Sequence, residues 1–241
     1  TWIERTETDP RRRQAVRRGA AAVWLDGVRD ALEADHRRWR HARVEGLGPV
    51  ADQMAVLISR RADVALVSIE RALKPVRGDE PVPPLAIVGL DGSESYYTFV
   101  SYYYPDEGEW GTSGGVYLNE GEGCFPVIAF PTKVKHGIDQ TIAHELTHHA
   151  LHGLGLPLWV EEGFTQMMEE RVTGLPNFKL DREMMGRQRE KWVEGDLERF
   201  VAGECFSSAH DDEQELAYHL SQLVVRGWLT REPARFFAFA R

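Results

Sequence analysis

The segment HELTHH, residues 144–149, places three histidines and a glutamate among apolar neighbours. Residues four apart on a helix differ by about 40° around the axis and about 6 Å along it. His144 and His148 can therefore aim both imidazoles at one point, and Glu145 lies on the same side. This is the H-E-x-x-H arrangement, in which two histidines bind zinc and the carboxylate takes a proton from a zinc-bound water.

Two histidines do not complete a catalytic zinc site, which takes three protein ligands and keeps one position open. Gly153 to Pro157 predict a turn, and residues 159–172 then read as a second helix. If this helix returns antiparallel to the first, its opening turn in LPLWVEEGFTQ presents a carboxylate to the histidines. His152, one turn beyond His148, is an alternative third ligand, but one helix does not easily bring three successive turns to a tetrahedral centre.

HELTH followed by PLWVEEGF resembles the gluzincin HExxH metallopeptidases, in particular the peptidase MA-like family. The resemblance covers residues 126–170 best and does not extend to the first 84 residues. The second segment is also similar to the WLNEGFA segment of zinc aminopeptidases, in which the glutamate before the glycine binds the metal. Matched in this way, the third ligand falls on Glu162 rather than Glu161, and Thr165 stands where these families usually carry alanine.

The resemblance implies a peptidase with one zinc ion per chain, held by His144, His148 and Glu162. Glu145 would act as the general base that takes a proton from the zinc-activated water and passes it to the departing amine. The aminopeptidase GAMEN segment has no clear copy, so the sequence favours an endopeptidase over an aminopeptidase. A metal-binding scaffold without catalytic activity is the other alternative, although such a scaffold has no use for Glu145.

Gluzincins often take the group that stabilises the oxyanion from a later helix. The resemblance suggests Tyr218, in EQELAYHLSQLVV, for this role, with His219 and His210 as competitors. An ordinary half-buried helical tyrosine explains Tyr218 equally well. Gln166 and Glu169 follow Glu162 on its face of the helix, so either could orient a histidine ligand.

The order of predicted elements indicates an α+β fold, with an N-terminal helical region at 1–84. The resemblance implies that residues 85–241 form a zincin-like domain. Residues 10–40 and 49–74 predict a helical hairpin, which could be regulatory or dock a partner. Residues 85–131, rich in β-branched and aromatic residues, predict a small, mostly antiparallel sheet. The remaining elements predicted are a C-terminal group of helices at 138–152, 159–172, 181–193, 211–227 and 232–240.

Several strand segments could contribute to substrate binding. VIAFP, 127–131, or GVYLN, which ends at Asn119, could be an edge strand over the cleft that pairs with an extended substrate. The tyrosines at 102–104 either line the cleft or pack on the sheet. Residues 78–122 hold nine acids and no Lys or Arg, which indicates a solvated acidic surface or, beside the cleft, a preference for basic substrates.

Composition limits the remaining possibilities. A formal net charge of −9 argues against a general nucleic-acid binder, and no apolar run approaches the roughly 20 residues that span a bilayer. The first residues lack the apolar core of a signal peptide, which slightly favours the cytoplasm and leaves the compartment open. Cys124 and Cys205 form no CxxC pair and are expected as buried thiols, with one disulfide as the alternative.

Overall fold

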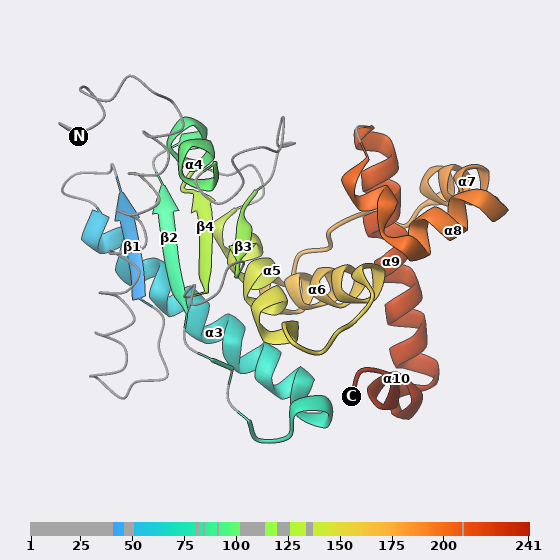
Figure 1. Ribbon diagram of the computed structural model, residues 1–241, viewed down its shortest axis with the longest axis horizontal. Helices are drawn as coiled ribbons and strands as arrows, with labels where there is room; N and C mark the ends of the chain where they lie inside the picture. Colours follow the sequence, from blue (N-terminus) through green and yellow to red (C-terminus); the bar gives the residue numbers. More distant parts are fainter. Residues whose placement is uncertain are drawn as a thin grey trace. The chain divides into compact units, whose positions relative to one another are not determined.

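A computed structural model of the chain describes residues 41–45, 51–80, 82–83, 85–90, 92–101, 114–119, 126–133, 137–208 and 210–241. The helix predicted at 10–40, the tyrosines at 102–104 and Cys124 lie outside these residues. The described part is mixed α+β, as predicted, and mostly helical (Figure 1).

The elements are labelled as in Figure 1. The strands are β1 (His41–Glu45), β2 (Ala86–Leu90), β3 (Val116–Leu118) and β4 (Val127–Pro131). The helices are α3 (Ala51–Arg77), α4 (Gly92–Val100), α5 (Ile138–Leu151), α6 (Leu158–Thr173), α7 (Arg182–Lys191), α8 (Glu194–Ala202), the 3-10 helix η2 (Glu204–Ser207), α9 (Asp211–Arg231) and α10 (Pro233–Phe239).

The sheet has the strand order β1-β2-β4-β3, visible in Figure 1. β1 pairs with β2, and β2 with β4, in parallel, whereas β3 pairs with β4 antiparallel. The prediction of a mostly antiparallel sheet is therefore wrong. All residues of β2 and β4 are buried, as is typical of parallel strands covered on both faces.

The position of the strands decides which one can accept a further strand. β4, the segment VIAFP, lies between β2 and β3, so its backbone is already paired on both sides. It cannot be the edge strand proposed from the sequence. β3, within GVYLN, does lie at an edge, and its use by a substrate stays a prediction.

The segment YYTFVSYYY, predicted as a strand, begins as the last part of helix α4. Tyr96 and Val100 lie four residues apart and are buried against Val88 and Val127 of the sheet. Glu94 in the first turn favours the helix electrostatically. The β-propensity of these aromatic residues is thus overridden by the packing that an amphipathic helix gains on the sheet, and α4 supplies the crossover that parallel strands need.

Two other elements differ from the prediction, one in its existence and one in its bounds. The strand β1 occupies residues 41–45, where only a connection was expected. The helix α3 continues past its predicted end at residue 74. Pro75 lies in its last turn without ending it, and the helix ends before Gly78, which has φ 67°. Arg77 closes this end by donating from Nη1 to the carbonyl oxygen of Ala150 at 2.9 Å.

The chain divides into two compact units, residues 1–61 with 83–141, and residues 62–82 with 142–241. The first unit contains the sheet and α4. The second contains helices α6 to α10 and most of α5, and all the candidate catalytic and metal-binding residues lie in it. Helix α8, which no prediction included, and η2 lie between α7 and α9. None of the helices in the described part of the chain is long and apolar enough to cross a membrane.

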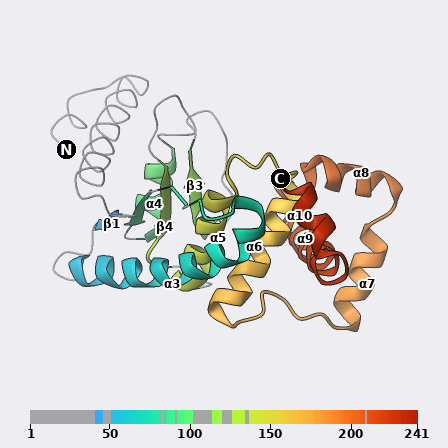
Figure 2. The same cartoon turned by 90° about the horizontal axis from the view of Figure 1, so that it is seen from below.

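Within the second unit, α6 and α9 pack closely against each other (Figures 1 and 2). Gly163 of α6 lies at the contact. A Cβ atom at this position would lie 2.7 Å from the carbonyl carbon of Ser221 and 2.7 Å from Cγ2 of Val225, both on α9. The glycine after Glu162 is therefore needed for the close approach of the two helices.

Candidate metal centre

Helix α5 positions the HELTHH segment. Its buried face is formed by Ile142, Leu146 and Ala150, at spacings of four residues. The neighbouring face carries His144 and His148, one turn apart. Their Nε2 atoms lie 3.1 Å from each other, so both imidazoles point to one place, as predicted from their spacing.

Helix α6 brings a carboxylate to the two imidazoles. The chain turns after α5 through Gly153 and Gly155, both at positive φ, and α6 then begins at Leu158. Oε2 of Glu162 lies 3.7 Å from Nε2 of His144 and 3.6 Å from Nε2 of His148. The side chains predicted as ligands from two helices are thus adjacent.

The arrangement of the three donor atoms fits a small divalent cation. Ligand atoms about 2.0–2.1 Å from a tetrahedral zinc ion lie about 3.3 Å from one another, close to the separations of 3.1, 3.6 and 3.7 Å found here. Moreover, Oε2 of Glu162 is buried and has no hydrogen-bond partner. Buried carboxylate oxygens normally have a partner, and a cation between these three atoms would supply it.

Each histidine is also held from its other side by a carboxylate. Nδ1 of His148 lies 2.8 Å from Oε1 of Glu161, and Nδ1 of His144 lies 3.2 Å from Oε2 of Glu169. If each Nδ1 carries the proton and donates it to its carboxylate, both Nε2 lone pairs face Glu162. Such carboxylate–histidine pairs fix the tautomer and orientation of metal-binding imidazoles.

Of the two residues proposed to orient the histidines, Glu169 does so and Gln166 does not. Gln166 instead accepts a hydrogen bond from Nδ2 of Asn177. Glu161, which contacts His148, was not predicted in this role. The only signal in the sequence was its position directly before Glu162, and the doubled acid gave no indication of which histidine each carboxylate would reach.

The charges of the cluster support one another. Burial lowers the pKa of His148, but the carboxylates of Glu162 and Glu161 outweigh burial and hold this pKa well above the usual value. The pKa of His144 is raised in the same way, against burial, by Glu169. The pKa of Glu162 is lowered, because attraction to the two histidines exceeds the effect of burial. The cluster therefore stabilises positive charge beside the Glu162 carboxylate.

Glu145 lies next to His144 on α5 and is 6% exposed. Burial raises its pKa, whereas the two histidines act in the opposite direction. A carboxylate with a raised pKa binds a proton more tightly and is a better general base near neutral pH. Glu145 is not one of the three grouped donors, as expected for a residue that does not bind the metal.

Tyr218 on α9 faces the same cluster. Its pKa is raised well above the usual tyrosine value by the negative charge of Glu162, by burial and by Glu145. The phenol therefore keeps its proton and is a hydrogen-bond donor beside the carboxylates. Its ring packs edge-on against Phe206, with 5.2 Å between the ring centroids.

The competing histidines have other surroundings. The ring of His219 stacks on Phe178 at 4.1 Å, and its Nδ1 lies 3.4 Å from Sδ of Met184, so His219 belongs to a packing contact. His210 is exposed at the N-cap of α9. His152 is exposed and is not part of the metal-binding group, whereas His149 is buried.

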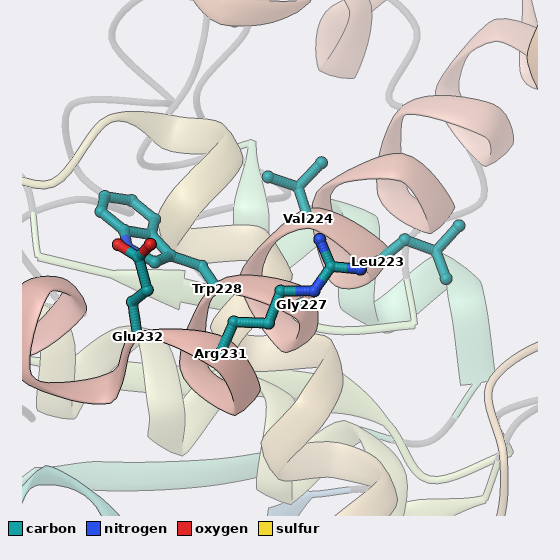
Figure 3. A pocket seen from close by; sticks show the side chains of 6 residues that line it. All are labelled: Leu223, Val224, Gly227, Trp228, Arg231 and Glu232. Carbon is teal, nitrogen blue, oxygen red and sulfur yellow. The ribbon is translucent and has the colours of Figure 1, made fainter.

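A hollow lies farther along α9, lined by Leu223, Val224, Gly227, Trp228, Arg231 and Glu232 (Figure 3). It contains none of the candidate metal ligands. Cys205 is a buried free thiol, as expected.

Comparisons of this chain with protein-family models, with curated proteins and with solved structures find no match.

Proposed function

We propose that this protein is a zinc-dependent endopeptidase of the gluzincin type. One observation carries the proposal: donor atoms of His144, His148 and Glu162 from two helices surround one point, and Oε2 of Glu162 has no hydrogen-bond partner there. The adjacent buried Glu145 supports a catalytic rather than a purely structural site. A structural zinc site is closed by four protein ligands, whereas three ligands leave a position for water.

The three ligands would hold one zinc ion per chain. When bound, zinc lowers the pKa of water to about 7 and polarises a carbonyl oxygen. Glu161 and Glu169 keep the imidazoles in the tautomer that leaves both Nε2 lone pairs free for the metal.

Glu145 performs the proton transfers. Its carboxylate takes a proton from the attacking water and then donates it to the nitrogen of the departing amine, so that the peptide bond breaks and the carboxylate is regenerated. Tyr218 donates its O–H to the developing oxyanion, since a tyrosine phenol is protonated at neutral pH. The substrate is a peptide or an unfolded protein.

Replacement of Glu145 by glutamine tests the proposal. Hydrolysis of an N-acetylated, unfolded polypeptide by the zinc-loaded protein should fall by at least about 10³-fold, because the amide cannot accept the proton, while the zinc content stays at one per chain. Glu190→Gln, at an exposed site on α7, is the matched control and should keep full activity.

The blocked N-terminus separates the alternatives, since an aminopeptidase would not cut this substrate. Full activity of Glu145→Gln would contradict the mechanism. Zinc binding by the unaltered protein without cleavage of any unfolded polypeptide would identify a metal-binding scaffold instead.

A further inference from the structure

Helix α8 carries an exposed apolar stripe for which the described residues show no covering contact. Leu197 lies four residues after Val193, which caps the helix, and four before Val201, so the three side chains follow one another along one face. They are 59% (Val193), 43% (Leu197) and 59% (Val201) exposed. The adjoining side of the helix is already filled, since Phe200, three residues after Leu197, is buried among Trp159, Trp192 and Phe206. The stripe is thus additional to the core.

The stripe leads toward the candidate metal centre. Gly203 caps α8, and Leu158, the first residue of α6, packs on it, with its Cδ2 3.3 Å from the place where a Cβ of Gly203 would lie. Leu158 is itself 39% exposed. It precedes Glu162 by four residues, so it lies one turn away on the same side of α6. An exposed apolar residue therefore lies beside the C-terminal end of α8, one turn before the carboxylate ligand.

The size of this surface indicates what binds it. The stripe on α8 is about 12 Å long, the length of about four residues of extended chain. Four side chains of this size expose on the order of 300 Å², well below the roughly 800 Å² that each partner buries in a stable dimer. A second copy of the chain would need a larger surface, whereas a single polypeptide segment fits.

We propose that Leu158, Val193, Leu197 and Val201, here called the apolar track, bind bulky apolar side chains of the substrate on one side of the bond that is cut. The inference rests on the proposed endopeptidase function and specifies its substrate class. The substrates are unfolded polypeptides with several large apolar residues within reach of the scissile bond, since a folded protein keeps such residues in its core.

A binding measurement with catalytically inert protein tests the apolar track. The Glu145→Gln protein is titrated against a fluorescently labelled, alkylated polypeptide that stays unfolded, and fluorescence anisotropy gives the Kd. Adding Val193→Ser, Leu197→Ser and Val201→Ser should raise this Kd about tenfold. These exposed residues contribute little to the core, and Val193→Ser places a favourable cap on α8, so a thermal midpoint no lower than that of the parent checks folding.

The matched control is Val224→Ser, in the hollow on α9 (Figure 3). Val224 is 39% exposed, so the substitution removes a comparable apolar group elsewhere in the same unit. The Kd of the Glu145→Gln protein for the unfolded polypeptide should not change when Val224→Ser is added. An equal Kd for the triple variant and its parent would overturn the proposal, as would a dimer in light scattering that only the triple substitution dissociates.

Kinetics with active protein then link the track to cleavage. The triple variant should show a KM about tenfold higher for the unfolded polypeptide, and an unchanged KM for a peptide too short to reach α8. An equal rise for both substrates would contradict a distant binding surface. The anisotropy measurement does not depend on hydrolysis. If the triple substitution weakens binding but the unaltered protein cleaves no polypeptide, the peptidase proposal is rejected, and the apolar track is a polypeptide-binding surface without that activity.

Discussion

Two buried glutamates of the second unit, Glu162 and Glu213, are equally shielded from water, with side chains 9% exposed, but differ in what neutralises them. Glu213 accepts from Nζ of Lys191 and from Nη1 of Arg199, each at 2.8 Å. Glu162 faces two imidazoles, and its Oε2 accepts no hydrogen bond. Lys191 and Arg199 supply permanent cations to Glu213, whereas Glu162 faces only histidines, which are charged only when protonated. The second arrangement is the one that we propose for a metal site.

The close packing of α6 on α9 holds Glu162 in place, and Gly163→Ala should disturb it most. The added Cβ would meet the backbone of Ser221, so the free energy of unfolding should fall by about 2 to 3 kcal/mol in urea denaturation. Gly227→Ala, in α9 with no atom near its Cβ position, is the control and should raise stability by about 0.5 to 1 kcal/mol. Equal effects of both variants would contradict the role given to Gly163.

The carboxylates behind the histidines should matter for metal binding. Glu161→Gln and Glu169→Gln each weaken the orientation and basicity of one imidazole, so zinc affinity should fall by about 10- to 100-fold in a chelator competition titration. Glu170→Gln is the control, because Glu170 pairs with Arg226 and not with a histidine. Unchanged affinity in both test variants would show that the histidines are held by other means.

The pH dependence of stability should reveal the Glu213 cluster. Lys191 first, then Ser208 and Arg199, hold the pKa of Glu213 at about 2, against burial and below its usual value of 4.5. A depressed carboxyl pKa stabilises the folded state above the unfolded pKa, and this stability is lost as the pH falls from about 4.5 to about 2. The loss should be about 2 kcal/mol, reduced from the full shift because Arg199 is partly exposed.

Glu213→Gln should remove that part of the acid dependence and leave zinc binding intact. Thermal midpoints between pH 2 and pH 6 compare the variant with the unaltered protein. Parallel curves for the two proteins would show that Glu213 is not neutralised as described.

The sequence predicted the helices of the candidate site better than the sheet. Helices α5 and α6 have buried positions at helical spacing and a glycine turn between them, so their bounds and the meeting of His144 and His148 followed from local signals. The choice of Glu162 as the third member rested on the family resemblance. The local sequence pattern predicts on which face of its own helix a side chain lies. It does not predict the distance between α6 and α9, which depends on the contact of Gly163 with α9.

The sheet and the residues around the ligands depend on non-local contacts. Tyr96 and Val100 suit a strand as well as a helix, and only packing on the sheet selects the helix. Parallel pairing of β2 with β4 follows from that helical crossover, which the sequence pattern did not show. Likewise, the contact of Glu161 with His148 is decided by the side on which α6 passes α5, which no single segment encodes.

Zinc content of the Glu162→Gln and Glu213→Gln proteins, measured after dialysis beside the unaltered protein, tests the central claim most directly. We expect one zinc per chain in the unaltered and Glu213→Gln proteins, and less than about a tenth of that in Glu162→Gln, because two imidazoles alone do not hold the metal tightly. One zinc per chain retained in Glu162→Gln would contradict the assignment of Glu162 as the third ligand, and with it the proposed catalytic site.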